Sequence, residues 1–102
     1  MDSTIKINDS TIGKSTSPYI IAELSGNHNG NINRAMELID AASDAGANAV
    51  KLQTYTADTI TINSNRPEFM IKSGLWAGKN LYELYSEAST PWDWHEHLFK
   101  YA

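Results

Sequence analysis

The sequence has no cysteine, few basic residues and no long apolar run, and each lack excludes a class of protein. Without cysteine there is no disulfide framework, no thiolate-bound zinc and no thiol nucleophile. A total of 8 basic against 12 acidic residues gives a net charge of −4, which argues against a protein whose main task is to grip nucleic-acid phosphates. The longest apolar run, residues 19–22, is far shorter than the roughly 20 residues that a membrane helix needs.

The remaining composition is that of a globular protein. Of the 102 residues, 41% are hydrophobic and 20% are charged, and about 100 residues are enough for one domain. Residues 1–4 lack the basic-then-apolar order of a signal peptide. We therefore expect a soluble, cytoplasmic chain that binds neither nucleic acid nor a membrane.

Two short stretches near the N-terminus predict β structure. Within residues 1–18, apolar and polar residues alternate around Asn8, Asp9 and Ser10, which is typical of a small hairpin. Residues 19–24 are mostly apolar and rich in residues that favour strands. This pattern predicts a strand that is covered on both faces.

The next segment has the order of a βαβ unit. Residues 25–31 form a polar loop punctuated by glycine, after which apolar residues recur at spacings of three and four. This spacing predicts a helix with Asn31 or Asn33 as its N-cap and Gly46 as its stop. Residues 49–55 predict a second strand, which we expect to run parallel to the first after a right-handed crossover.

The C-terminal half is predicted as a long loop followed by two helices. Residues 56–78 lack periodicity, and a loop of this length in a compact domain is commonly functional or mobile. Residues 80–87 predict a short helix. A second helix opens with Thr90 as N-cap and Pro91 in the first helical position. Its pattern continues to residue 102 without a C-cap, so we expect the chain to be the opening part of a larger one.

Three polar residues lie at the carboxyl ends of the predicted parallel strands, where α/β proteins place their active sites. Glu23 belongs to the first strand, and Lys51 and Gln53 share one face of the second. One interpretation is an internal ion pair between Glu23 and Lys51 that only closes the end of the sheet. The other is a binding site, in which the lysine holds a phosphate or carboxylate and the glutamate orients or deprotonates a water or hydroxyl.

Other polar and aromatic residues also allow a structural interpretation. The loop after the first strand offers amides, an imidazole and backbone N–H groups to an anion or a sugar hydroxyl, but helix capping explains the same residues. His95 and His97 are two positions apart, point to different sides of a helix and cannot share one metal ion, so we interpret them as surface or packing residues. We interpret Trp76, Trp92 and Trp94 as packing residues rather than as a carbohydrate-binding platform.

Several of these segments together resemble the sialic acid synthase family. The main signature consists of Ile20–Glu23, Asn27–Gly30 and Asp44–Tyr55. The branch of the family that makes pseudaminic acid is favoured over the N-acetylneuraminate and legionaminate branches by four further segments: Ser25-Gly26, Arg66–Phe69, Gly74–Gly78 and Thr90–His95. The similarity covers roughly residues 5–102.

The resemblance implies a fold of the α/β class. We expect the N-terminal part of a (β/α)8 TIM barrel, preceded by a small β-hairpin over residues 1–18. Residues 19–102 would then hold the first βαβ unit and the loop and helices that follow it. The rest of the barrel and a C-terminal antifreeze-like domain would lie outside this sequence.

The resemblance also implies a reaction. The family condenses phosphoenolpyruvate with an open-chain amino-hexose, in this branch a diacetamido-trideoxy-altrose. The C3 carbon of phosphoenolpyruvate attacks the sugar aldehyde, water adds at C2 and phosphate leaves. The enzymes work as homodimers and use a divalent metal, manganese or magnesium, to polarise the aldehyde.

Roles for individual residues follow from their positions in the family motifs. Glu23 is implied as the catalytic residue near the reacting carbons. Substrate binding is implied for Lys51, which holds phosphoenolpyruvate, and for Gln53, Asn27, His28, Tyr55 and Arg66. The family's metal-binding histidine pair lies on later strands, so we expect neither a metal ligand nor a bound metal within these residues.

Three hypotheses about function remain open. The chain is part of an enzyme of the pseudaminic acid branch, or part of an N-acetylneuraminate or legionaminate synthase of the same family. Alternatively, it is a free-standing anion-binding or regulatory module that catalyses nothing. Because a (β/α)8 barrel needs about 250 residues, we expect the 102 residues to be inactive by themselves.

Overall fold

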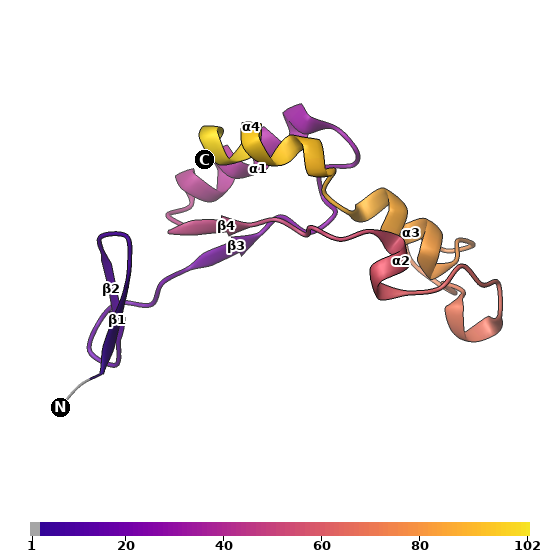
Figure 1. The fold of residues 1–102 in the computed structure, drawn as a ribbon, viewed down its shortest axis with the longest axis horizontal. Coiled ribbons are helices and arrows are strands. Elements are labelled where there is room, and N and C mark those ends of the chain that lie inside the picture. The colour runs from indigo at the N-terminus through magenta and orange to yellow at the C-terminus, as the bar shows by residue number, and fades with distance from the viewer. Residues whose placement is uncertain (1–2) are drawn as a thin grey trace.

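The computed structural model describes residues 3–102 and has an extended shape (Figure 1). An N-terminal hairpin lies at one end, a βαβ unit in the middle and a helical segment at the other end. The radius of gyration is 17.2 Å, compared with about 13 Å for a compact domain of this length. No helix within residues 3–102 is long and apolar enough to cross a membrane.

The N-terminal segment contains a two-stranded hairpin. Strands β1 (Thr4–Ile7) and β2 (Ser10–Gly13) pair in antiparallel fashion, joined by a two-residue turn. Asn8 in this turn has a φ of 52°, a left-handed conformation that asparagine tolerates better than most residues. The part of the hairpin prediction that falls on residues 1–2 lies outside the described residues.

The predicted βαβ unit is present. Strands β3 (Ile21–Glu23) and β4 (Ala49–Lys51) are parallel and joined through helix α1 (Ile32–Asp44). Their register sets Glu23 directly opposite Lys51. The two polar residues at the strand ends are therefore brought together by the backbone pairing itself.

Both strands are shorter than the predicted ranges of 19–24 and 49–55. The chain after Lys51 stays extended, but it no longer pairs with β3. Instead, the carbonyl of Gln53 accepts a hydrogen bond of 2.9 Å from the backbone N–H of Thr90. The regular sheet ends there because the next backbone partner comes from the far end of the chain.

Helix α1 has the predicted caps. The side-chain oxygen of Asn31 accepts hydrogen bonds from the N–H groups of Asn33 and Arg34, at 2.8 and 3.3 Å. Asn31 is therefore the N-cap, and Asn33 lies inside the helix. After the helix, Gly46 has a φ of 90°, a conformation that glycine adopts without strain.

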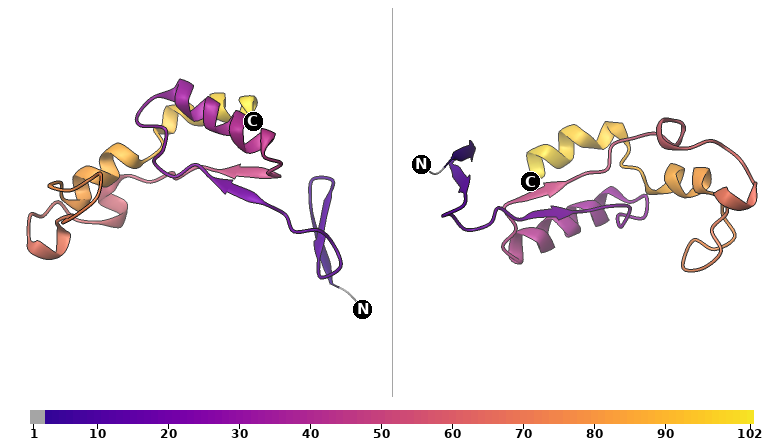
Figure 2. Two further views of the ribbon diagram at one scale, coloured as in Figure 1. Left: turned by 180° about the vertical axis from the view of Figure 1, so that it is seen from behind. Right: turned by 90° about the horizontal axis from the view of Figure 1, so that it is seen from below.

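The hydrophobic core lies on one face of the β3–β4 sheet. Helix α1 and helix α4 (His95–Tyr101) both lie on that side of the strands (Figures 1 and 2). The strands and the two helices together bury four side chains: Leu24, Ala35, Ile39 and Leu98. The apolar side chains of Val50 and Leu52 pack against this cluster from β4 and its continuation.

The opposite face of the β3–β4 sheet is open. Ile21 is 55% exposed, and Glu23 alternates onto the same face. The prediction that the first strand is covered on both faces is therefore wrong for this chain. The reason is that α1 and α4 pack on one face only, and no segment of residues 3–102 covers the other.

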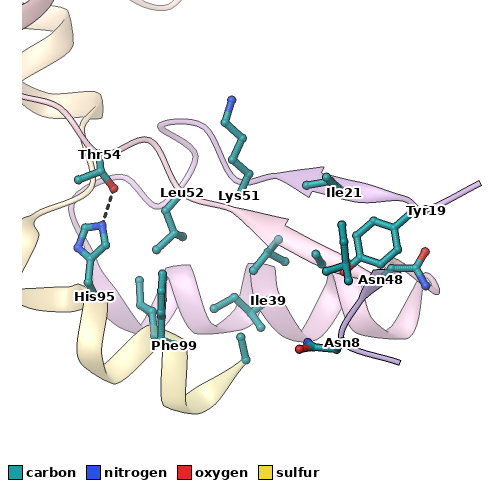
Figure 3. A pocket seen from close by; sticks show the side chains of 15 residues that line it. Asn8, Tyr19, Ile21, Ile39, Asn48, Lys51, Leu52, Thr54, His95 and Phe99 are labelled. Carbon is teal, nitrogen blue, oxygen red and sulfur yellow. Dashed lines mark hydrogen bonds between the residues drawn. The ribbon is translucent and has the colours of Figure 1, made fainter. Parts of the chain in front are cut away.

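An apolar groove of about 730 Å³ runs between β4 and α4 (Figure 3). Leu52 and Phe99 extend into the groove, whereas Lys51 points away from the helices. At one end of the groove, the Thr54 hydroxyl hydrogen-bonds to Nε2 of His95. This bond links α4 to the chain segment that follows β4.

Between β4 and α4, the chain forms short helices rather than one long loop. They are α2 (Ala57–Ile60), the 3-10 turn η1 (Pro67–Phe69), α3 (Leu81–Ala88) and the 3-10 turn η2 (Trp92–Trp94). Helix α3 confirms the helix predicted over residues 80–87. The expectation of an irregular segment over residues 56–78 is wrong at α2 and η1, because single turns are too short to produce a periodic pattern.

The predicted cap of the last helix is also wrong. The side-chain oxygen of Thr90 is buried and has no hydrogen-bond partner, so Thr90 does not cap this helix. Its backbone is instead bonded to Gln53, which turns the side chain into the interior. The helix consequently begins as the 3-10 turn η2, preceded by Pro91.

Truncation of Leu98 tests the position of the core. Leu98 is 1% exposed, so Leu98→Ala should lower the free energy of unfolding by about 2–5 kcal/mol. The neighbouring Phe99 is 72% exposed, and Phe99→Ala should change this free energy by only about 0.5 kcal/mol. Chemical denaturation followed by circular dichroism measures both, and equal losses would contradict the placement of the core.

Alkaline pH should weaken the contact between α1 and α4. The Tyr101 hydroxyl donates to both carboxylate oxygens of Asp40 at 2.8 Å, and this hydrogen bond is the main cause that raises the pKa of Tyr101 above 10.0. The stabilisation is therefore complete below the unfolded-state pKa and is lost as the pH rises through the higher folded-state pKa.

The variant Tyr101→Phe tests this pH dependence. It should remove the part of the alkaline stability loss that Tyr101 causes, because phenylalanine does not titrate. Denaturation curves recorded at a series of pH values above neutrality measure the effect. An alkaline loss as steep in Tyr101→Phe as in the unsubstituted chain would show that the contact with Asp40 contributes nothing.

Candidate active site

A glutamate and a lysine form an ion pair at the carboxyl ends of β3 and β4. Lys51 Nζ lies 3.1 Å from Glu23 Oε2, and the side chains are 65% and 34% exposed. An ion pair with this exposure contributes only about 0–1 kcal/mol to stability. The sheet therefore depends little on the pair, and both side chains are accessible to a ligand.

A cavity of about 770 Å³ is lined by Ser25 and Gln53, which follow Glu23 and Lys51 by two residues, whereas the ion pair itself does not line it. Gln53 lines the cavity and lies two residues after Lys51 in an extended segment. Because alternate residues of an extended chain point to the same side, the cavity continues the face that carries the ion pair. Its volume is in the range of about 300–1,000 Å³ that small-molecule sites occupy.

The cavity has a polar wall and an apolar wall. The polar wall comes from the loop before α1, the start of that helix and the continuation of β4: Ser25, Asn27, Asn29, Arg34 and Gln53. The apolar wall is built by aliphatic and aromatic side chains from residues 55–85: Tyr55, Leu75, Trp76, Leu84 and Tyr85. A ligand with both hydroxyl or amide groups and apolar atoms matches such a surface.

The loop that forms the polar wall is held in a constrained conformation. Ser25 and Asn29 both have a φ of 51°, in the left-handed region that costs energy for residues other than glycine. The side chain of Arg34 stabilises the loop from the helix, because its Nε donates a hydrogen bond of 2.6 Å to the carbonyl of Asn27. The amide of Asn27 is exposed and faces the cavity from this loop.

His28 lies beneath the loop and does not line the cavity. Its side chain is 1% exposed. Nδ1 accepts a hydrogen bond of 3.0 Å from the N–H of Gly30, so the hydrogen is on Nε2, which donates to the carbonyl of Ala88 at 3.2 Å. The ring also packs edge-on against Trp94. Both ring nitrogens are thus bonded to the backbone of this chain.

The backbone at Gly26 also lies very close to the end of α3. A Cβ atom added to Gly26 would lie 2.7 Å from the Cβ of Ala88, which is closer than real carbon atoms approach. Gly26 therefore allows the loop to pack directly on the end of α3. Together, Gly26 and His28 join the loop after β3 to the helix that carries part of the apolar wall.

Tyr55 and Tyr85 meet within the apolar wall. Their rings pack edge to face with a centroid distance of 5.8 Å. Burial, followed by the neighbouring Tyr85, raises the pKa of Tyr55 above its ordinary value. The Tyr55 hydroxyl therefore stays protonated at neutral pH and can donate a hydrogen bond to a ligand.

The structure does not bring Arg66 into this site. Arg66 is exposed, pairs with Glu68 at 3.2 Å and does not line the cavity. Of the other residues considered from the sequence, His97 contacts the sulfur of Met36 and Trp94 packs on the core, as the packing interpretation predicts. Trp92 differs, because it is 67% exposed.

Trp76, Lys79 and Glu87 are among the cavity residues that the sequence does not indicate as site residues. The sequence favours a packing role for Trp76 and gives no signal for Lys79 or Glu87. In the structure all three line the cavity, where Lys79 pairs with Glu87 and lies 5.6 Å from the centre of the Trp76 ring. The glycines on either side of the Leu75-Trp76-Ala77 segment were the available signal, because they mark an exposed turn.

A divalent metal does not fit the residues of this chain alone. Within residues 3–102 there is no group of three or more histidine, aspartate or glutamate side chains that could hold a metal ion. Glu23 supplies a single carboxylate, and it is paired with Lys51.

A parallel βαβ unit with a partly polar cavity beyond the carboxyl ends of its strands is typical of small-molecule-binding α/β proteins. The family model described as "NeuB family" matches residues 38–102. The chain therefore belongs to the NeuB family, which confirms the resemblance to sialic acid synthases expected from the motifs.

Known relatives and a solved structure agree with this family. The chain is 52% identical to pseudaminic acid synthase of Campylobacter jejuni over 84 residues, which are 82% of this chain and 24% of that protein. It is also 52% identical to pseudaminic acid synthase of Helicobacter pylori, over 83% of this chain and 25% of that protein. The chain thus spans about a quarter of the length of these relatives.

A solved structure also matches nearly the whole of this chain and less than a third of its own length. The crystal structure of N-acetylneuraminic acid synthetase from Leptospira borgpetersenii matches with a TM-score of 0.74 and 28% identity, over 99% of this chain and 30% of that one. The chain has the mixed α/β elements of these synthases, and the β3–β4 sheet is an open two-stranded one.

Removal of the His28 ring should loosen the loop of the polar wall. His28→Ala leaves the Gly30 N–H and the Ala88 carbonyl without their partners, which costs roughly 1–3 kcal/mol for the buried carbonyl. Hydrogen exchange at Gly30 should become faster, as measured by NMR. The exposed His97 provides the matched control, since His97→Ala should leave exchange at Gly30 unchanged. Unchanged exchange in His28→Ala would contradict the structural role.

Proposed function

We propose that this chain forms part of the active site of a pseudaminic acid synthase, which condenses phosphoenolpyruvate with an open-chain diacetamido-trideoxy-altrose and releases phosphate. The observation that carries the proposal is the accessible Glu23–Lys51 pair at the carboxyl ends of the strands, two residues before Ser25 and Gln53, which line the cavity. The 52% identity to the pseudaminic acid synthases of two bacteria supports the choice of this substrate.

Lys51 is proposed to bind phosphoenolpyruvate. Its side chain points away from the helices, on the open face of the sheet (Figure 3), and is 65% exposed. A lysine offers three donors and a positive charge to a phosphate or carboxylate. Since its present partner Glu23 is also accessible, an anionic substrate can take over the contact without breaking the sheet.

Glu23 is proposed to act at the reacting carbons. A carboxylate next to a bound phosphoenolpyruvate can orient the water that adds at C2 and accept its proton. Displacement of Lys51 towards the substrate would leave the Glu23 carboxylate free for this task. Gln53, Asn27 and Tyr55 are proposed to bind the sugar from the cavity walls, and His28 to position the loop rather than to touch substrate.

The open face of the sheet supports the further proposal that residues 19–102 form the opening part of a (β/α)8 barrel. In such a barrel, the face of the strands opposite the helices points to the interior. Lys51 points away from α1 and α4 (Figure 3), and Glu23, its ion-pair and register partner, belongs to the same face. The divalent metal and the homodimer of the family stay predictions, and no step above uses a metal.

The identity of the sugar separates the proposed function from its alternative within the family. N-acetylneuraminate or legionaminate synthesis would use the same phosphoenolpyruvate site, and the structural match to an N-acetylneuraminic acid synthetase supports that alternative. Phosphate release from phosphoenolpyruvate by the full-length enzyme, measured with altro- and manno-configured diacetamido sugars and with N-acetylmannosamine, separates these cases. Faster turnover of a manno sugar would contradict the pseudaminic acid assignment.

Substitution of Lys51 tests its proposed role. In the full-length enzyme, Lys51→Ala should raise the KM for phosphoenolpyruvate by about 10–100-fold, because a hydrogen bond to a charged group is lost. Steady-state phosphate release measures this constant. The exposed Lys100, which pairs with Glu96 on α4, is the matched control, and Lys100→Ala should leave the KM unchanged.

Lys51→Ala also distinguishes a role of the Glu23–Lys51 pair in substrate binding from a purely structural role. If the Glu23–Lys51 pair only closes the end of the sheet, Lys51→Ala will alter the free energy of unfolding and leave the KM near its normal value. If no sugar supports phosphate release by the unsubstituted full-length enzyme, the non-catalytic module becomes the better explanation.

A further inference from the structure

The apolar wall of the cavity includes the tip of a small antiparallel turn formed by residues 70–80. Met70 and Asn80 form a β-bridge at its base, and backbone hydrogen bonds of 3.0 and 3.1 Å join Ile71 to Lys79 and Gly78. The base is well anchored, because the Asn80 side chain is 2% exposed. Residues 70–80 therefore form an ordered, hydrogen-bonded turn and not an irregular loop.

The tip of this turn presents apolar side chains. Gly74 and Gly78 have φ values of 88° and 89°, which lets the chain reverse on both sides of the tip. Leu75 is 92% exposed, and both Leu75 and Trp76 line the cavity. Two large apolar residues at an exposed tip are unfavourable in water, so their position against a cavity points to contact with a ligand.

The Trp76 ring is held in place by charged neighbours. Lys79 Nζ lies 5.6 Å from the ring centre and pairs with Glu87 of α3. A lysine ammonium near an indole ring attracts it through the cation–π interaction. Because Glu87 neutralises Lys79, the pair fixes the ring without leaving an unpaired positive charge next to the sugar.

Trp76 lines the cavity whereas Glu23 and Lys51 do not, so Trp76 would meet a part of the sugar away from the reacting end. The new carbon–carbon bond forms at the sugar aldehyde, which must therefore lie near Glu23 and Lys51. Gln53 connects that end to the cavity, and the tip at Leu75 and Trp76 contributes the apolar wall. The terminal carbon of an open-chain hexose, farthest from the aldehyde, is the part that would reach this wall.

We propose that Trp76 is a specificity-determining residue that selects sugars whose terminal carbon is a methyl group over sugars that carry a hydroxyl there. This inference rests on the proposed function. A methyl group can pack on the indole ring, whereas a hydroxyl finds no hydrogen-bond partner on Leu75 or the ring, and the neighbouring Lys79 and Glu87 are already bonded to each other.

Competition between two sugars tests the proposal. In the full-length enzyme, kcat/KM is measured for the diacetamido-trideoxy-altrose and for the same sugar with a hydroxyl on its terminal carbon. The unsubstituted enzyme should prefer the deoxy sugar by about 10–100-fold, the range that hydrophobic contacts with small groups supply. Trp76→Ala should reduce this preference to within a few-fold, while the KM for phosphoenolpyruvate stays unchanged.

Two further variants control for a general loss of structure. Trp76→Phe retains an aromatic ring and should keep most of the preference. Trp92→Ala removes a tryptophan that is 67% exposed and does not line the cavity, so the preference should be intact. A preference that survives in Trp76→Ala, or that is absent from the unsubstituted enzyme, would overturn the proposal.

The result is separable from the test of the proposed function. An unsubstituted enzyme that uses the altro sugar while Trp76→Ala keeps its selectivity leaves the proposed function intact and refutes the role of Trp76. An unsubstituted enzyme that is inactive with both altro sugars but active with manno sugars refutes the proposed function itself.

Discussion

The parallel pairing of β3 with β4 is the constraint on which the rest of the structure depends. Its register sets Glu23 opposite Lys51, which are 28 residues apart in the sequence, and turns both side chains to the same face. The crossover through α1 then places the apolar residues of the strands on the other face, against the helices. A shift of the register by one residue would exchange the two faces and destroy both the ion pair and the core.

A second connection shapes the cavity next to this ion pair. His28 and Gly26 attach the loop after β3 to the end of α3, through buried hydrogen bonds and a close backbone contact. The loop supplies the polar wall, and α3 with the turn over residues 70–80 supplies the apolar wall. The cavity thus joins segments that are far apart in the sequence, and its shape depends on a buried imidazole that does not line it.

The sequence predicted the elements that depend on local patterns. Asn31 and Gly46 mark the ends of α1 because an N-cap side chain and a left-handed glycine act within one helical turn. The same reasoning fails at Thr90, because the hydrogen bond that its N–H donates to the carbonyl of the distant Gln53 determines its backbone position. The pairing of Glu23 with Lys51 was foreseen as one of two interpretations, since strand order and alternation place both at one edge.

By itself, the sequence determined the order of the βαβ unit, the caps of α1 and the chemistry available at the strand ends, all of which follow from residue type and spacing. Only the tertiary structure decided which side chains enclose the cavity. His28 became a buried support because it bonds to Ala88, 60 residues away, and Trp76 became part of a wall because its neighbour Lys79 pairs with Glu87 of α3. Such contacts leave no periodic trace in the sequence, because their geometry depends on how distant segments pack.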